Sequence, residues 1–101
     1  MAREFSELQH FALCLIQALL GVVSDNFRFV SITAKSQTIF VQIVLARHCD
    51  EDFEEIEDFK TEFEALLPGP TDYEVEVVVS QEPISWPNES TIVVFKKREG
   101  G

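Results

Sequence analysis

The chain alternates between two hydrophobic periodicities. Apolar residues recur at three- and four-residue steps from Glu4 to about Leu20 and again from Asp50 to Leu67, which predicts two amphipathic helices. Four other runs are rich in β-branched and aromatic residues and predict strands. These runs are Phe27 to Ala34, Thr38 to Arg47, Asp72 to Ser80 and Thr91 to Lys97.

Turn-forming residues separate these elements. Gly21 marks the end of the first helix, and Lys35-Ser36-Gln37 is short enough to join the first two strands as a hairpin. Pro68-Gly69-Pro70 ends the second helix, because proline cannot continue a helical hydrogen-bond ladder. The order α-β-β-α-β-β predicts one α+β domain over residues 1–101. We expect a two-layer α/β sandwich, with a four-stranded, mainly antiparallel sheet and two helices on one face.

The hydrophobic pattern of each strand predicts its place in the sheet. Thr38 to Arg47 is apolar on both faces and should be central, whereas Asp72 to Ser80 alternates with outward glutamates, as at an edge. The run Ile92 to Phe95 is continuously apolar, which favours a position inside the sheet. The order 1-2-4-3 would be wholly antiparallel. The order 1-2-3-4, with strands two and three parallel across a helical crossover, stays open.

The first helix carries more apolar surface than one sheet contact would bury. Its apolar arc exceeds half of the circumference once Leu13 and Ala18 are counted, so we expect it also to touch the second helix or a partner.

The second helix holds half of the 18 acidic residues of the chain. Its outer arc is almost purely acidic, and like-charged pairs such as Glu54/Asp58 each cost about 0.2 to 0.5 kcal/mol. A helix selected only for stability would carry more lysine, so the arc suggests a partner. A solvated face that keeps the domain soluble is an equally good interpretation. The acids that we expect to contact a partner are Glu51, Glu54, Glu55, Asp58 and Glu62.

The charge balance limits the class of partner. A formal net charge of −10 disfavours binding to nucleic acid or to an anionic membrane and favours a basic protein. Two cysteines, Cys14 and Cys49, make no disulfide framework and fit the reducing cytoplasm as free thiols. The apolar run from Phe11 to Val23 is too short to span a bilayer, and the acidic first residues do not resemble an export signal.

No pattern in the chain supports catalysis, a cofactor or a metal site. His48-Cys49 is the only pairing that resembles a nucleophile and its base, and the surrounding carboxylates would disfavour the thiolate. The acidic helix lacks the glycine and the ligand spacing of a calcium loop. His48, Cys49 and Asp50 lack the second Cys or His pair of a transition-metal site. We therefore expect a protein that is not an enzyme.

The loop from Glu82 to Pro87 contains the only tryptophan, Trp86, between two prolines. One interpretation is a lid that covers the end of the core. The other is a rigid, exposed anchor for a partner, since aromatic anchors dominate interface energetics.

Four stretches give the chain the overall character of small bacterial immunity proteins: QALLGVVSDNFRFVSI, EDFEEIEDFKTEFEAL, EPISWP and VVFKKRE. The chain resembles those that neutralise toxins of contact-dependent growth inhibition or colicin type. This resemblance implies a cytoplasmic, non-enzymatic inhibitor that binds one cognate toxin domain, often a basic nuclease, and blocks its active site. The alternative is a small structural or regulatory domain that forms a homodimer through the open sheet face, where Phe40 and Val44 would otherwise be exposed.

Overall fold

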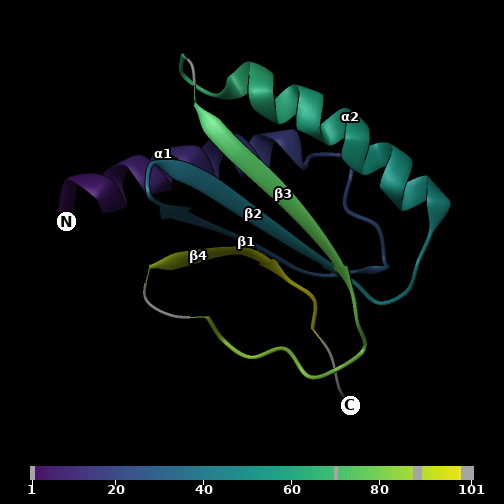
Figure 1. Ribbon diagram of the computed structural model, residues 1–101. Coiled ribbons are helices and arrows are strands. Elements are labelled where there is room, and N and C mark those ends of the chain that lie inside the picture. Colours follow the sequence, from purple (N-terminus) through teal and green to yellow (C-terminus); the bar gives the residue numbers. More distant parts are fainter. Residues whose placement is uncertain (1, 70, 88–89, 99–101) are drawn as a thin grey trace.

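The computed structural model describes residues 2–69, 71–87 and 90–98, with side chains from residue 7 onward. A four-stranded sheet carries both helices on one face, and the element order is the predicted α-β-β-α-β-β (Figure 1). The elements are α1 (Ala2–Ala18), β1 (Phe27–Lys35), β2 (Thr38–Leu45), α2 (Asp50–Leu66), β3 (Asp72–Val79) and β4 (Thr91–Lys96).

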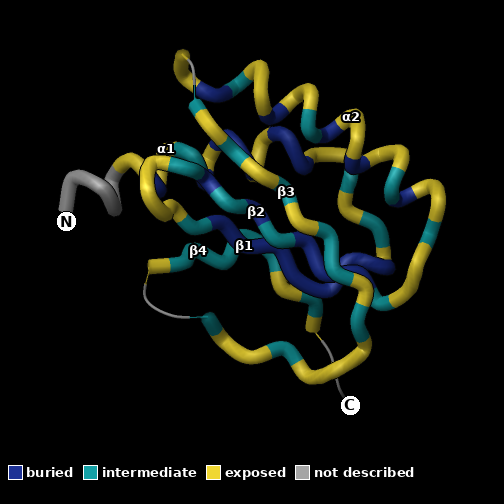
Figure 2. The backbone as a smooth tube through the Cα atoms, in the orientation of Figure 1, coloured by how far each residue is buried: buried dark blue, intermediate teal, exposed yellow. Residues whose placement is uncertain are grey.

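The hydrophobic core lies between the helices and the sheet. Every second residue of β2 points into it, and Ile39, Val41, Ile43 and Leu45 are each at most 2% exposed. The helices contribute Leu15, Ile56, Phe59 and Phe63 to the same cluster. In Figure 2 the tube is accordingly dark blue, for buried residues, along the central strands and yellow, for exposed residues, on the outer side of α2. The prediction that β2 is central is confirmed.

The strand order is β3-β2-β1-β4, which differs from both predicted orders. β2 and β3 form a parallel pair across the α2 crossover, as the second predicted order has them, and β1 pairs antiparallel with both β2 and β4. The sheet is therefore mainly antiparallel with one parallel pair. The prediction that β3 is an edge strand is confirmed.

The prediction that the last strand lies inside the sheet is wrong, because β4 is the second edge strand. Its residues from Thr91 to Phe95 are all half-buried rather than buried. Ile92, Val94 and Phe95 pack against the core beneath the helices, so the continuous apolar run reflects core contacts at an edge. A register shift in the β1/β4 pairing, between Val30 and Ser31, breaks the simple alternation that a sequence pattern assumes.

The connections follow the turn chemistry of the sequence. Ser36 and Gln37 both have positive φ, 51° and 68°, the backbone that a two-residue hairpin of type I′ requires. Gly21 adopts a φ of 83° and follows the end of α1, which stops two residues before the predicted end. Pro70, part of the predicted stop of α2, lies outside the described residues.

α1 contacts the second helix, as predicted, and also presents apolar side chains to solvent. The Cys14 thiol lies 3.5 Å from the carbonyl oxygen of Leu66 in α2. Leu13 and Ile16 of α1 are 64% and 44% exposed, and Leu20, just beyond its end, is 75% exposed.

Candidate functional site

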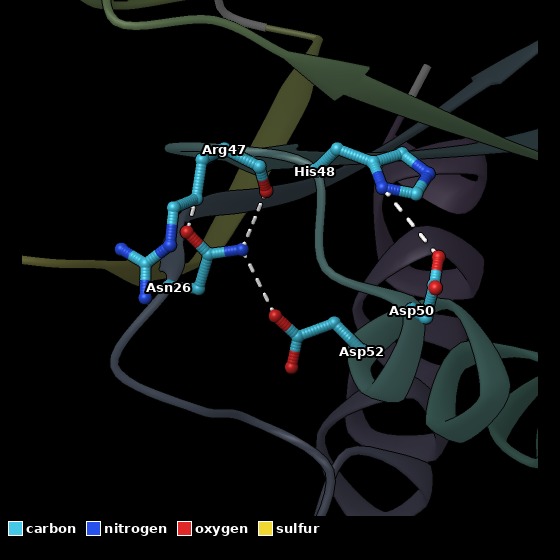
Figure 3. Close-up of polar contacts among 5 residues, drawn as sticks. All are labelled: Asn26, Arg47, His48, Asp50 and Asp52. Atoms are coloured by element: carbon cyan, nitrogen blue, oxygen red, sulfur yellow. Dashed lines mark hydrogen bonds and ion pairs between the residues drawn. The ribbon is translucent and has the colours of Figure 1, made fainter.

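A buried polar cluster fixes the start of α2 against the sheet (Figure 3). The Asn26 side chain donates from Nδ2 to the Arg47 carbonyl oxygen at 2.7 Å and to Asp52 Oδ2 at 2.9 Å. Its Oδ1 accepts from the Arg47 backbone N–H at 3.0 Å. Asn26 and Asp52 are 6% and 5% exposed, so the bond between them forms away from water, whereas the two bonds to Arg47 are partly buried. One side chain thus joins the turn before β1, the end of β2 and the first turn of α2.

The outer surface of α2 carries the acids that the sequence selects. Glu51, Glu54, Glu55, Asp58 and Glu62 are all exposed. Among the described residues, none of these five carboxylates has a hydrogen bond or an ion pair. Other acids of α2 do have partners. Glu57 binds Lys60 at 2.8 Å, for example. The five acids therefore form an unneutralised surface, which we call the acidic face of α2.

The flank of α2 that faces β3 is tied to that strand by Tyr73. The Tyr73 hydroxyl lies 3.3 Å from Glu64 Oε1 and 3.4 Å from the Lys60 carbonyl oxygen. Burial raises the pKa of the Tyr73 phenol above its ordinary value of 10.0, and the neighbouring carboxylates of Glu64 and Glu57 raise it further. Carboxylates thus continue from the acidic face towards the β3 edge.

Trp86 is 70% exposed, so the lid interpretation does not hold for its side chain. Its neighbours Ser85 and Pro87, together with Ile84, line a hollow of about 570 Å³ on the sheet face opposite the helices. These residues belong to the segment from residue 81 to residue 87, which covers part of this sheet face and which we call the 81–87 loop.

The structure does not bring Trp86 and the acidic face of α2 together. α2 covers one face of the sheet, whereas the 81–87 loop passes along the other side (Figure 1). A partner that contacts both surfaces has to reach round an edge of the sheet. β3 is the edge that lies next to α2, and it leads directly into the 81–87 loop.

Comparison with known families decides what kind of protein this is. A model of the MafI2 immunity protein matches residues 9–99, which is nearly the whole chain. The chain belongs to the MafI2 immunity protein family. The suspected relationship to bacterial toxin immunity proteins is thereby confirmed, and the family gives the chain an immunity function against a toxin. No curated protein matches the chain in sequence.

The other chemistry-bearing residues of this immunity protein have ordinary structural roles. His48 stacks on Phe53 with ring centroids 4.7 Å apart, and its Nδ1 lies 3.6 Å from the exposed carboxylate of Asp50. Cys49 is the N-cap of α2, although its side chain makes no capping hydrogen bond. Both cysteines are free, and Cys14 is buried.

Metal-ligand clusters and membrane-spanning helices are both absent from the part of the chain that the structure describes. Within it, no group of three or more His, Cys, Asp or Glu side chains could hold a metal ion. None of its helices is long and apolar enough to cross a membrane.

Sequence reasoning missed the residues that position the site. Neither Asn26, in the polar segment before β1, nor Asp52, within the acidic run, was among the predicted site residues, although both are buried. A signal was present, since Asp52 sits one residue before Phe53 and four before the buried Ile56, on the inward side of α2. Glu74 and Glu76 were assigned to a solvated strand face, and the structure places both at the hollow beside the 81–87 loop.

Proposed function

We propose that this immunity protein neutralises a cognate toxin domain by binding it through the acidic face of α2. The toxin domain is of the nuclease type and has a basic surface. The proposal places the encounter in the cytoplasm and involves no catalysis by the immunity protein. The observation that carries it is the group of five exposed, unneutralised carboxylates on one helix in a chain of net charge −10.

The geometry of α2 gives a physical reason for this choice. Carboxylates on an exposed helix present regularly spaced negative charge, as a nucleic-acid backbone does, and a cleft that binds phosphates through Lys and Arg would accept them. The buried Asn26 cluster holds α2 at a fixed angle, so little conformational entropy is lost when the face meets its partner. Long-range attraction between the two charged surfaces would also speed their encounter.

Trp86 enters the proposal as a second contact on the other side of the β3 edge. An exposed tryptophan flanked by prolines loses little freedom on binding and is the residue type most enriched among interface hot spots. If the toxin covers it, Trp86→Ala should speed dissociation by a factor that corresponds to about 2 kcal/mol or more.

Self-association through the sheet is less well supported. Val44 is only 7% exposed and Phe40 is half-buried, because the 81–87 loop covers that end of the open face. The remaining hollow is bordered by glutamates, which two copies would bring together.

The function can be tested with the toxin encoded by the neighbouring gene. Coexpression with the immunity protein should restore growth of cells that produce the toxin, and the purified pair should form a stable complex in which the toxin is inactive. A charge-reversed variant with lysine at Glu51, Glu54, Glu55, Asp58 and Glu62 should fold and fail to protect. Full protection by this variant would refute the assignment of the surface, and absence of any complex with the wild-type protein would refute the proposed function.

A further inference from the structure

We propose that the hollow on the open sheet face is a subsite for an arginine side chain of the toxin, carried on a segment that crosses the β3 edge. This inference rests on the proposed function, and it adds a second point of contact to the acidic face of α2.

The hollow lies over the middle of the sheet. Its floor is formed by β1, β2 and β3, and its wall is the 81–87 loop, of which Ile84 and Pro87 are part. Phe40 supplies a half-buried aromatic surface at the floor. A volume of about 570 Å³ accepts a long side chain together with part of the backbone that carries it.

The polar groups around the hollow are strongly biased towards hydrogen-bond acceptors. Glu74 and Glu76 line it, and no basic side chain among the described residues pairs with either of them. Gln42 donates from Nε2 to Glu76 Oε1 at 3.0 Å, which fixes the carboxylate and leaves the Gln42 carbonyl oxygen free to accept. Thr33 also lines the hollow, and because it donates its hydroxyl proton to the Ser90 carbonyl oxygen at 2.9 Å, its oxygen can act only as an acceptor.

The hydroxyl of Ser31 points to a ligand independently of the carboxylates. Ser31 is 7% exposed, lines the hollow and has no hydrogen-bond partner among the described groups. Every fully buried side-chain nitrogen or oxygen among the described residues has a partner, so the Ser31 hydroxyl is reached from the hollow and a protein partner for it has to come from there. A donor that enters the hollow would supply one.

An arginine fits this set of groups better than other side chains. The guanidinium group has five donors and no acceptor, so it can satisfy two carboxylates and neighbouring oxygens at once. Its planar face stacks on aromatic rings, for which Phe40 is available at the floor. A lysine would match the charge, but not the number of acceptors or the stacking surface.

The proposed path also explains how one partner reaches both surfaces. Glu57 and Glu64 lie on the β3 flank of α2, and Glu74 and Glu76 lie on the other side of the same strand. A basic segment that leaves the acidic face of α2 therefore meets further carboxylates before the hollow, of which Glu57 is paired with Lys60.

A pair of neutralising substitutions tests the subsite against the toxin. Glu74→Gln with Glu76→Gln should raise the dissociation rate of the complex at least about tenfold and change the association rate less than threefold, since a charge-assisted contact within a hollow acts mainly on the bound state. The matched control is Glu7→Gln with Asp25→Asn, which removes the same charge from exposed positions outside the hollow and the 81–87 loop and should leave dissociation within about twofold.

The identity of the side chain is tested without the toxin. In a titration followed by amide chemical shifts, the peptide Ac-Gly-Arg-Gly-NH₂ should move signals of Ser31, Phe40 and Gln42, and the neutral citrulline peptide should not. Equal shifts from the two peptides, shifts confined to α2, or stronger binding of the lysine peptide would each overturn the assignment.

The two proposals fail in different ways. If the toxin binds and the Glu74→Gln, Glu76→Gln variant dissociates like the control, the subsite is wrong and the acidic face of α2 remains the proposed contact. If the wild-type protein binds no toxin at all, the proposed function is wrong, and the hollow loses its assigned occupant even if the arginine peptide binds. A twofold change in apparent mass on light scattering that the Phe40→Lys substitution abolishes would assign the hollow to a second copy instead.

Discussion

Replacement of the buried Asn26 by alanine should strongly destabilise the protein. The alanine variant removes three hydrogen bonds, at 2.7, 2.9 and 3.0 Å. The Arg47 carbonyl and N–H groups and the Asp52 carboxylate then lose a partner in a region where Asp52 is only 5% exposed.

The magnitude follows from what is left unpaired. Each buried polar group without a partner costs about 1 to 3 kcal/mol, and a hydrogen bond to a charged group is worth about 1.5 to 3 kcal/mol. Water will reach part of the site, so we expect a loss of roughly 3 to 5 kcal/mol in the free energy of unfolding. A domain of this size is stable by about 5 to 15 kcal/mol, so the variant should be close to its limit.

Urea unfolding followed by circular dichroism measures this loss, with Asp25→Ala as the matched control because Asp25 is adjacent and exposed. The control should change the unfolding free energy by less than about 0.5 kcal/mol. Asp52→Asn keeps an acceptor for Asn26 and should cost less than Asn26→Ala. A loss below about 1 kcal/mol for Asn26→Ala would mean that the cluster does not fix α2 to the sheet.

Three further predictions concern charge, thiols and the single tyrosine. Salt at neutral pH should raise the melting temperature, because it screens the self-repulsion of a chain of net charge −10; a decrease would contradict this. Cys14→Ser and Cys49→Ser should both leave toxin binding intact. Cys14→Ser should cost at most about 1 to 3 kcal/mol in stability, as the Leu66 carbonyl can accept from the new hydroxyl, and loss of binding by a folded Cys49→Ser variant would overturn this. The pKa of Tyr73 is raised in the folded state, so the unfolded chain loses this proton first and stability should fall as pH rises above about 10. Absorbance at 295 nm titrates this tyrosine alone, and Tyr73→Phe should flatten the alkaline loss of stability; a midpoint at or below 10.0 would contradict the prediction.

The sequence was sufficient for the elements and for the layer arrangement, because both depend on hydrophobic periodicity. The alternation of β2 and the three- and four-residue steps of α2 each identify an inward face, and the structure buries those faces. The edge position of β3 followed from its outward glutamates in the same way.

Strand order depends on how the chain crosses the molecule, which local patterns do not encode. The long 81–87 loop carries the chain across the open face, so β4 pairs with β1 rather than with its neighbour in sequence. The sequence of β4 is continuously apolar because several of its residues contact the core across a register shift. This pattern resembles that of a strand buried on both faces.

The candidate site could be predicted only in part. Exposed carboxylates on an amphipathic helix follow from the helical period, so the acidic face of α2 was within reach of the sequence. That Trp86 lies on the opposite side of the sheet follows from strand order, and the pairing of Asn26 with Asp52 spans 26 residues, so neither could be read from local patterns.

The central claim concerns electrostatic docking on α2, and the association rate of the immunity protein with its toxin tests it most directly. Glu54→Lys with Asp58→Lys and the control Glu7→Lys with Asp25→Lys change the net charge equally, so stopped-flow measurements from about 20 to 300 mM salt isolate the position of the charge. We predict that the α2 variant associates about tenfold more slowly than the control at low salt, and that the two rates converge as salt screens the field. Equal association rates for the two variants at every salt concentration would show that the acidic face of α2 is only a solubilising surface.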